Sequence, residues 1–360
     1  MVFSFFFPFL AASWHVIDAD SFPIVSQVYP DLSRKGAYVP DAIYTPEDVQ
    51  GIIAYAKDRG VRVVIEFDIP GHSSFGYAYP EIVGCPSYYD HPYVYEKQSV
   101  ALDPTVDKTY EILGNFLREF DRVFPDAYMH LGGDEVRHKC WESNANIKAF
   151  MDANGIPTYL DLERYFWDRL NKEVLHTLSK TVIVWDDAFV NEVPVPDNAL
   201  IHVWQTNSYL VDAIKAGRQV VRSNGWYLDQ SVPGAYRYRW LETWVDFYVL
   251  EPVPAGLTPA EEALVLGGQA CMWTEMVDHN TFDAIVWPRA SATAERLWSP
   301  KTLTNSTEAG YRLMDHRCRL VSLPSSLFVL YFFLIRQLIF AFMFFHETAH
   351  EKRERESHLP

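Results

Sequence analysis

Seven short apolar runs recur along the chain, and helical patterns separate several of them. Each run has the length of a strand, is rich in β-branched or aromatic residues, and lacks a clean alternation of apolar and polar positions. Such runs are typical of strands that are buried on both faces of a parallel sheet. They are SWHVID (13–18), RVVIEFD (62–68), AYMHLGGDE (127–135), TVIVWDD (181–187), LIHVWQT (200–206), QVVRSNGWY (219–227) and VLGGQACMW (265–273).

The segments between these runs predict helices. Residues 45–60 begin with a threonine cap signal and early acids and end with a glycine, and residues 109–124 and 159–180 are amphipathic. Strands that alternate with helices indicate an α/β fold. Polar and aromatic residues gather at the C-terminal ends of the strands, where a (β/α)8 barrel builds its active site. We therefore predict an α/β fold of the TIM-type (β/α)8 barrel class.

Composition narrows the possible functions. The chain has 360 residues, of which 49% are hydrophobic and 15% aromatic, so it can bury a sizeable core. The aromatic residues could belong to cores and interfaces, or they could stack on sugars. A formal charge of −16 argues against a nucleic-acid partner. Because zinc-type cysteine pairs and Gly-rich phosphate loops are missing from the sequence, we predict no metal and no cofactor.

The two ends do not fit the barrel pattern, which leaves 13–320 as the predicted barrel domain. Residues 1–12 are apolar and could be a signal segment or a foreign piece, but they lack a basic start. Residues 327–345, within the end segment 321–360, are apolar and just long enough to span a bilayer, as a membrane anchor would. Arg336 at the centre of this stretch costs about 2.5–3.5 kcal/mol on insertion, so a foreign tail is the alternative.

Two cysteines and one asparagine bear on the compartment. Cys85 and Cys140 both follow strand ends, in loops on the same predicted face, so a disulfide between them is plausible in an oxidising compartment. Asn305 begins an Asn-Ser-Thr glycosylation sequon. Both features favour a secreted protein over a cytosolic one.

Two adjacent acids, Asp134 and Glu135, follow a glycine pair in HLGGDEV at the end of an apolar run. Asp134 alone could cap the next helix. Polar and aromatic residues, however, also end most of the other runs, and this concentration on one face predicts a functional site. The other strand-end residues are His15, Asp18, Asp68, His72, Trp185, Trp204, Tyr227, Trp273 and Glu275.

Two acids in a tryptophan-lined site suggest glycoside hydrolysis. Ordinary glycosidases place their two carboxyl groups on opposite sides of the sugar, and adjacent residues cannot easily do so. The pair fits a third route better, in which the sugar's own 2-acetamido oxygen is the nucleophile. One carboxyl then acts as general acid, and the other orients the acetamido group and stabilises its developing charge.

The motifs WHVIDADSFP, EFDIPGH, HLGGDEV, WYLD and ACMWTE, in this order, resemble the β-N-acetylhexosaminidases of glycoside hydrolase family 20. The resemblance covers about residues 13–320 and is closest to animal lysosomal hexosaminidase subunits. It implies that Glu135 is the general acid/base and that Asp134 orients the acetamido group. It further implies that His72 tunes Glu135, with Asp18 as the supporting acid of His72.

The resemblance also implies a set of substrate-binding residues. Trp185, Trp204 and Trp273 would surround the acetamido methyl group, and Tyr227 would bind the acetamido oxygen. Asp229 and Glu275 would hold sugar hydroxyls. Asp229-Gln230 matches the family's subunits that prefer neutral substrates. The implied partners are amino-sugar glycans and a second subunit in a homo- or heterodimer, and the implied location is lysosomal or extracellular.

The chain also departs from this family. The first barrel strand of the family, with its sugar-gripping arginine, has no counterpart here, so we expect a barrel of seven strands with an open edge. Cys318 is expected to have no partner. An inactive sugar-binding or membrane-tethered protein of the same family is therefore the alternative. A metal-dependent hydrolase using Asp68, His72, His130 and Asp134 is a third possibility, which sensitivity to chelators would reveal.

Overall fold

The computed structural model describes residues 3–6, 9–90, 94–229, 242–275, 277–278 and 280–322. These residues belong to two compact units. One unit is Ser13–Val220, and the other combines Met1–Ala12 with Val221–Pro360. The expected apolar stretch 327–345 and Gln230 lie outside the described residues. The predicted limits of the barrel domain therefore remain predictions.

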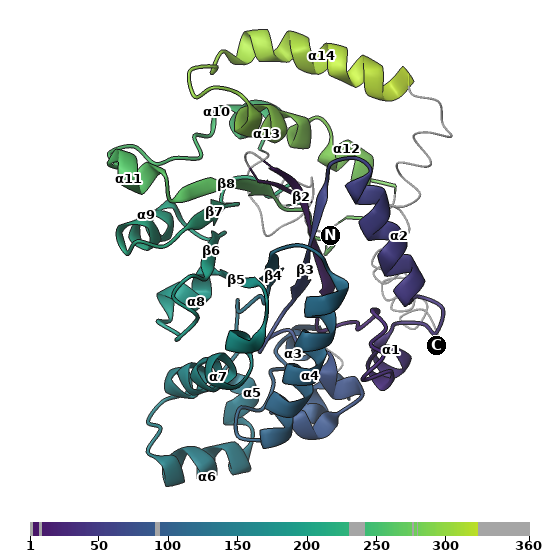
Figure 1. The fold of residues 1–360 in the computed structure, drawn as a ribbon, viewed down its shortest axis with the longest axis vertical. Coiled ribbons are helices and arrows are strands. Elements are labelled where there is room, and N and C mark those ends of the chain that lie inside the picture. The colour runs from purple at the N-terminus through teal and green to yellow at the C-terminus, as the bar shows by residue number, and fades with distance from the viewer. Residues whose placement is uncertain are drawn as a thin grey trace, which may run out of the picture. The chain divides into compact units, whose positions relative to one another are not determined.

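The unit Ser13–Val220 is built on a parallel sheet (Figure 1). Glu66 pairs with His130 and Ile183 with Leu200, in parallel registers that run across four consecutive strands. Nearly every residue of these strands is buried, as expected for a sheet covered on both faces. The strands are β2 (Phe9–Ile17), whose first four residues belong to the other unit, β3 (Arg62–Phe67), β4 (Tyr128–His130), β5 (Thr181–Trp185) and β6 (Leu200–Val203), and β7 (Val220–Arg222) begins where the unit ends.

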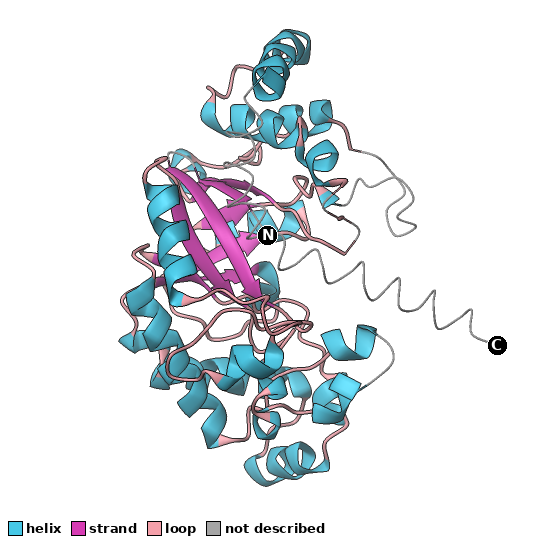
Figure 2. Cartoon of the chain, turned by 90° about the vertical axis from the view of Figure 1, so that its right-hand side faces the viewer, coloured by secondary structure: helices cyan, strands magenta, loops and turns pink. Residues whose placement is uncertain are grey.

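Helices follow the strands of this unit and lie outside the sheet (Figure 2). The capping box predicted at Thr45 is present, since its hydroxyl accepts from Asp48 N–H at 3.2 Å. Phe116 and Phe120 of α4 pack their rings 4.8 and 5.0 Å from that of Phe67 in β3. The helices are α1 (Asp31–Gly36), α2 (Pro46–Lys57), η1 (Phe75–Tyr77), η2 (Pro80–Ile82), η3 (Pro86–Asp90), α3 (Val94–Gln98), α4 (Asp107–Val123), α5 (Lys139–Glu142), α6 (Ala145–Asn154), α7 (Tyr159–Glu173), η4 (Leu175–Thr177), α8 (Asp186–Val190) and α9 (Asn207–Lys215).

The second unit contains the strand β8 (Val265–Ala270) and an antiparallel partner for it, β1 (Phe3–Phe6). Strand β1 also pairs with residues 9–10, at the start of β2. The expectation of an open edge is therefore wrong for β8, because the apolar N-terminal segment supplies backbone groups that pair with it. The helices of this unit are α10 (Trp244–Val249), α11 (Pro259–Glu262), α12 (Phe282–Val286), α13 (Arg289–Trp298) and α14 (Ser306–Ser322).

The predicted fold class is confirmed. The chain has an α/β fold in which seven strands, β2 to β8, alternate with helices as in a (β/α)8 TIM-type barrel. Within the described part of the chain, every helix is too short or too polar to cross a bilayer.

Candidate active site

The glycine pair after β4 allows a buried carboxylate to lie against the backbone. Gly132 and Gly133 have φ angles of +64° and +91°, which favour glycine. A Cβ atom on Gly132 would lie only 1.9 Å from Asp68 Oδ1. The N–H of Gly133 donates to the same oxygen at 3.1 Å. The HLGGDEV motif thus brings its two acids to the end of β3, where Asp68 lies.

Two of the predicted catalytic residues have left-handed backbones. The φ angle is +44° at His72 and +46° at Glu135, and neither residue is a glycine. Such conformations cost about 1–3 kcal/mol each and cluster at functional sites. The two turns touch, since a Cβ atom on Gly71 would lie 3.2 Å from the carbonyl oxygen of Asp134. The turns that carry the two strained residues therefore lie next to each other.

His72 lies among three carboxylates. Its Nδ1 is 2.8 Å from Asp68 Oδ2 and 4.0 Å from Asp134 Oδ2, and its Nε2 is 3.7 Å from Glu135 Oε2. Burial lowers the pKa of His72, but Asp68 and Glu135 outweigh burial and raise that pKa well above its usual range. A protonated His72 therefore joins the two acids of the motif.

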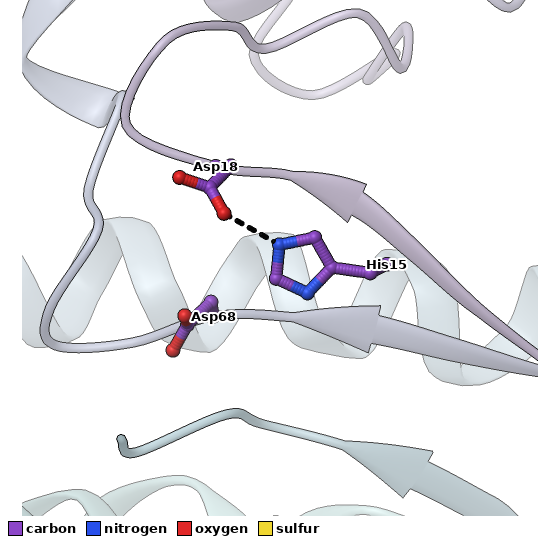
Figure 3. A group of neighbouring side chains, drawn as sticks. All are labelled: His15, Asp18 and Asp68. Atoms are coloured by element: carbon purple, nitrogen blue, oxygen red, sulfur yellow. Dashed lines mark hydrogen bonds and ion pairs between the residues drawn. The ribbon is translucent and has the colours of Figure 1, made fainter. Parts of the chain in front are cut away.

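The acid that supports His72 differs from the expected one. Asp68, and not Asp18, hydrogen-bonds His72. Asp18 instead binds His15, with 2.8 Å between Oδ2 and Nε2, because both residues lie at the end of β2 (Figure 3). Asp18 acts on His72 through its charge alone. The sequence placed Asp68 at a strand end without assigning it this role.

Asp134 is poised to receive a hydrogen-bond donor. Its side chain is 13% exposed, and burial raises its pKa well above the usual range, with the charge of Asp68 adding to the effect. Among the described residues, its Oδ1 is buried without a hydrogen-bond partner. A ligand N–H in this place would satisfy that oxygen and favour its charged form.

Glu135 is more open than its neighbour. Its side chain is 39% exposed, and its Oε1 lies 3.2 Å from Arg137 Nη2. The imidazole of His72, 3.7 Å away, lowers the pKa of Glu135, burial opposes this, and the charge of Arg137 lowers the pKa further. Its own N–H donates to Asp187 Oδ1 at 3.3 Å. The free protein therefore favours an ionised Glu135.

Two of the predicted tryptophans lie in the same unit and are held by acids. Trp185 ends β5, and its indole N–H donates to Glu66 Oε1 at 3.1 Å. Trp204 follows β6, and its indole N–H donates to Asp187 Oδ2 at 2.8 Å. Asp187 thereby links Trp204 to the backbone of Glu135. Glu66 and Asp187 were not singled out from the sequence, although EFD and WDD carry them.

The other predicted sugar-binding residues lie in the second unit. Tyr227 forms a backbone bridge with Cys271, and the N–H of Trp273 donates to Asp229 Oδ1 at 3.3 Å. Burial raises the pKa of Asp229 to about 7, and the charge of Glu275 adds to this. The four residues thus gather within this unit, and their contact with a sugar stays a prediction.

The predicted disulfide is present. Cys85 and Cys140 are bonded, with Cα atoms 5.2 Å apart, and join segments that are 55 residues apart in sequence. The bond ties the loop after β3 to α5, the helix that follows the HLGGDEV motif. Cys318 is a free and exposed cysteine, as expected from the chain's departure from the family pattern.

Two groups of side chains have the donor types of a cation site. They are His15 with Asp18 and Asp68 (Figure 3), and Asp68 with His72 and Asp134. In each group an imidazole already pairs with a carboxylate at 2.8 Å, which accounts for the clustering without a cation. His130 belongs to neither group, since its Nδ1 accepts the N–H of Gly132 at 3.0 Å. Of the four residues considered for a metal site, Asp68, His72 and Asp134 thus lie together, and His130 is not among them.

Comparisons with known proteins agree on one family. Residues 11–301 match the profile described as glycosyl hydrolase family 20, catalytic domain. The beta-hexosaminidase subunit beta of Mus musculus is 39% identical over 315 residues, which cover 86% of this chain and 56% of that protein. The subunit alpha of Rattus norvegicus is 40% identical over 319 residues, covering 86% and 58%. The chain thus spans little more than half the length of these curated relatives.

A solved structure shares the fold. The chitobiase of Flavobacterium johnsoniae superimposes with a TM-score of 0.72 at 31% identity. The match covers 94% of this chain and 48% of that one. Sequence and structure comparisons therefore lead to the same group of proteins.

Proposed function

Because the chain belongs to glycosyl hydrolase family 20, we propose that it removes terminal N-acetylglucosamine or N-acetylgalactosamine from the non-reducing ends of glycoconjugates. The proposal rests on one observation: the carboxylates of Asp134 and Glu135 lie 4.0 and 3.7 Å from the imidazole of His72. Both acids can then act from one side of a sugar. The opposite side is left to a nucleophile that the substrate itself supplies.

The proposed reaction has two steps and retains the anomeric configuration. Glu135 gives a proton to the leaving oxygen while the acetamido oxygen attacks the anomeric carbon, which forms a cyclic intermediate. Asp134 accepts the acetamido N–H through its buried, unpartnered Oδ1 and balances the positive charge on the ring. Water then opens the ring, and Glu135 takes the proton from that water.

Glu135 must be protonated to begin this cycle. In the free protein His72 and Arg137 hold its pKa low. A bound sugar would cover the 39% of the side chain that is exposed and remove water from it. Burial raises the pKa of a carboxyl group, so substrate binding itself favours the acid form.

The aromatic residues have proposed roles in binding. Trp185, Trp204 and Trp273 would enclose the acetamido methyl group, and Tyr227 would donate to the acetamido oxygen. Asp229 and Glu275 would accept hydrogen bonds from sugar hydroxyls. The acid-held indoles of Trp185 and Trp204 support these roles, because a fixed ring loses little entropy on binding.

The decisive test compares matched substrates. The chain should cleave an aryl N-acetyl-β-glucosaminide and leave the aryl β-glucoside, which lacks the acetamido group, intact. Asp134→Asn should lower the rate on the first substrate by about 10²–10³-fold, the effect of losing one charge-stabilising group. Equal cleavage of both substrates would overturn the acetamido mechanism. Binding without any turnover would favour an inactive sugar-binding protein.

Assembly and location are also proposed. The curated relatives are named as alpha and beta subunits, and we expect this chain to associate with a second subunit as a homo- or heterodimer. The disulfide supports an oxidising compartment, either the lysosome or the extracellular space. Asn305 is exposed just before α14, which is compatible with glycosylation of its side chain.

A further inference from the structure

Four buried side chains on the strands of the first unit form a cluster that has no proposed contact with the sugar, namely Glu66, His15, His130 and His202. Glu66, in β3, is the centre of this cluster and its side chain is completely buried. Its Oε1 accepts the indole N–H of Trp185 at 3.1 Å and lies 3.0 Å from His15 Nδ1. A buried carboxylate is costly unless it is paired, so its partners decide its state.

Hydrogen bonds decide which imidazole carries the balancing charge. His130 Nδ1 accepts the N–H of Gly132 at 3.0 Å, so the proton of His130 is on Nε2 and points to His202 Nδ1, 3.2 Å away. His130 and His202 therefore form a neutral pair. Burial accordingly lowers the pKa of His130 to about 4 and lowers that of His202 as well.

His15 is the charged member. Its Nδ1 faces Glu66 Oε1 at 3.0 Å and its Nε2 faces Asp18 Oδ2 at 2.8 Å, so both nitrogens meet carboxylates. Burial lowers the pKa of His15, but Glu66 and Asp18 outweigh burial and raise it to about 10. Glu66 and His15 also interact through their charges with other ionisable groups, namely Asp68, His130, His202 and Asp134.

We infer that Glu66 is a positioning residue for the proposed hydrolysis: it holds His15 as an imidazolium, which fixes Asp18, and it holds the indole of Trp185. The inference rests on the proposed function. Glu66 acts on the surroundings of His72 through His15 and Asp18. It acts on the proposed acetamido pocket by holding the indole of Trp185. Glu66 itself touches neither Asp134 nor Glu135 by any described contact.

Glu66→Gln tests this inference, because the amide oxygen can still accept from Trp185 while the charge is lost. His15 then keeps one carboxylate, and its pKa falls. Each pH unit above the new pKa removes about tenfold of the charged form. Relative to the parent chain, the kcat of Glu66→Gln should therefore decrease between pH 5 and pH 8, by up to about tenfold for each pH unit above the new pKa of His15. A uniform loss across this range would overturn the inference.

Glu163→Gln is the matched control. Glu163 is equally buried in the same unit and pairs with His138 Nε2 at 2.8 Å, but it lies on α7 and outside the cluster. Removing the charge of Glu163 should lower the thermal midpoint, as Glu66→Gln should, while leaving the shape of the pH profile unchanged. If both variants change the pH dependence of kcat in the same way, the effect is one of general destabilisation and the inference fails.

A second measurement does not depend on turnover. In the full parent chain, ¹⁵N NMR of the imidazole nitrogens should find His15 doubly protonated at pH 8 while His130 and His202 are neutral. A neutral His15 at pH 6 would overturn the inference even if Glu66→Gln fails to fold. A parent chain that binds sugar without cleaving it contradicts the proposed function instead, and the NMR result still decides the state of His15.

Discussion

At the scale of single residues, the state of one proton decides whether Glu135 can work. His72 and Arg137 favour the carboxylate, and a covering sugar favours the acid. This balance explains why a residue proposed as an acid can be ionised in the free protein. It also makes the pH dependence of catalysis a readout of named contacts.

Removing the acid gives the first residue-scale prediction. Glu135→Gln keeps the size of the side chain but cannot donate an acidic proton. Turnover of a substrate with a poor leaving group, such as chitobiose, should fall by about 10²–10⁴-fold, while binding is kept. Steady-state kinetics and a binding titration separate the two effects. Undiminished hydrolysis of chitobiose would refute the role of Glu135.

Removing the charge of Arg137 gives the second residue-scale prediction. Arg137→Gln takes away a cation 3.2 Å from Glu135, so the pKa of Glu135 should rise. The acid form is needed, so kcat/KM declines as the pH rises past this pKa. The decline should move to higher pH in the variant. Arg164→Gln, which removes a half-exposed pair with Asp161, is the control and should not move it. A shift to lower pH would contradict the assignment.

At the scale of elements, loops after neighbouring strands are tied together around the site. The disulfide connects the loop after β3 to α5, close behind the turn that carries Asp134 and Glu135. Gly132 also brings these segments together, because its lack of a side chain lets Asp68 approach the backbone. The left-handed conformations of His72 and Glu135 can persist only because such contacts over-determine them.

The element-scale prediction concerns the disulfide. Replacing Cys85 and Cys140 together by serine opens a closed loop whose ends are 55 residues apart. The free energy of unfolding should fall by about 2–4 kcal/mol. Denaturant titration measures this change, and the parent chain under reducing conditions is the control. Activity that is lost at temperatures where the variant is still folded would show that the bond also orders the site.

At the scale of the whole molecule, a ligand that mimics the cyclic intermediate should stabilise the folded chain. A thiazoline analogue at one hundred times its dissociation constant would add about 2.7 kcal/mol to the free energy of unfolding. Calorimetry with and without the ligand measures the shift. Asp134→Asn should abolish most of it, and a chelator should change neither stabilisation nor activity. Chelator-sensitive turnover would revive a metal-dependent reaction.

Local sequence patterns were enough to predict the fold class and most of the proposed site. Seven β-branched runs and the helices between them are local patterns, and each run became a strand near its predicted place. The acids of HLGGDEV, the His72 turn and the cysteine pair were also identified, because strand ends of a parallel sheet meet at one edge. These features depend on spacing and on residue type, which a sequence displays directly.

The pairing of side chains, in contrast, became visible with the folded structure. The sequence offered Asp18 as the acid for His72, yet Asp68 takes that place and Asp18 binds His15. The central position of Glu66 could not be seen, since a glutamate within an apolar run carries no sign of its partners. The antiparallel pairing of β1 was equally hidden. Pairing depends on distances of a few ångströms between strands remote in sequence, and packing of the whole sheet sets those distances.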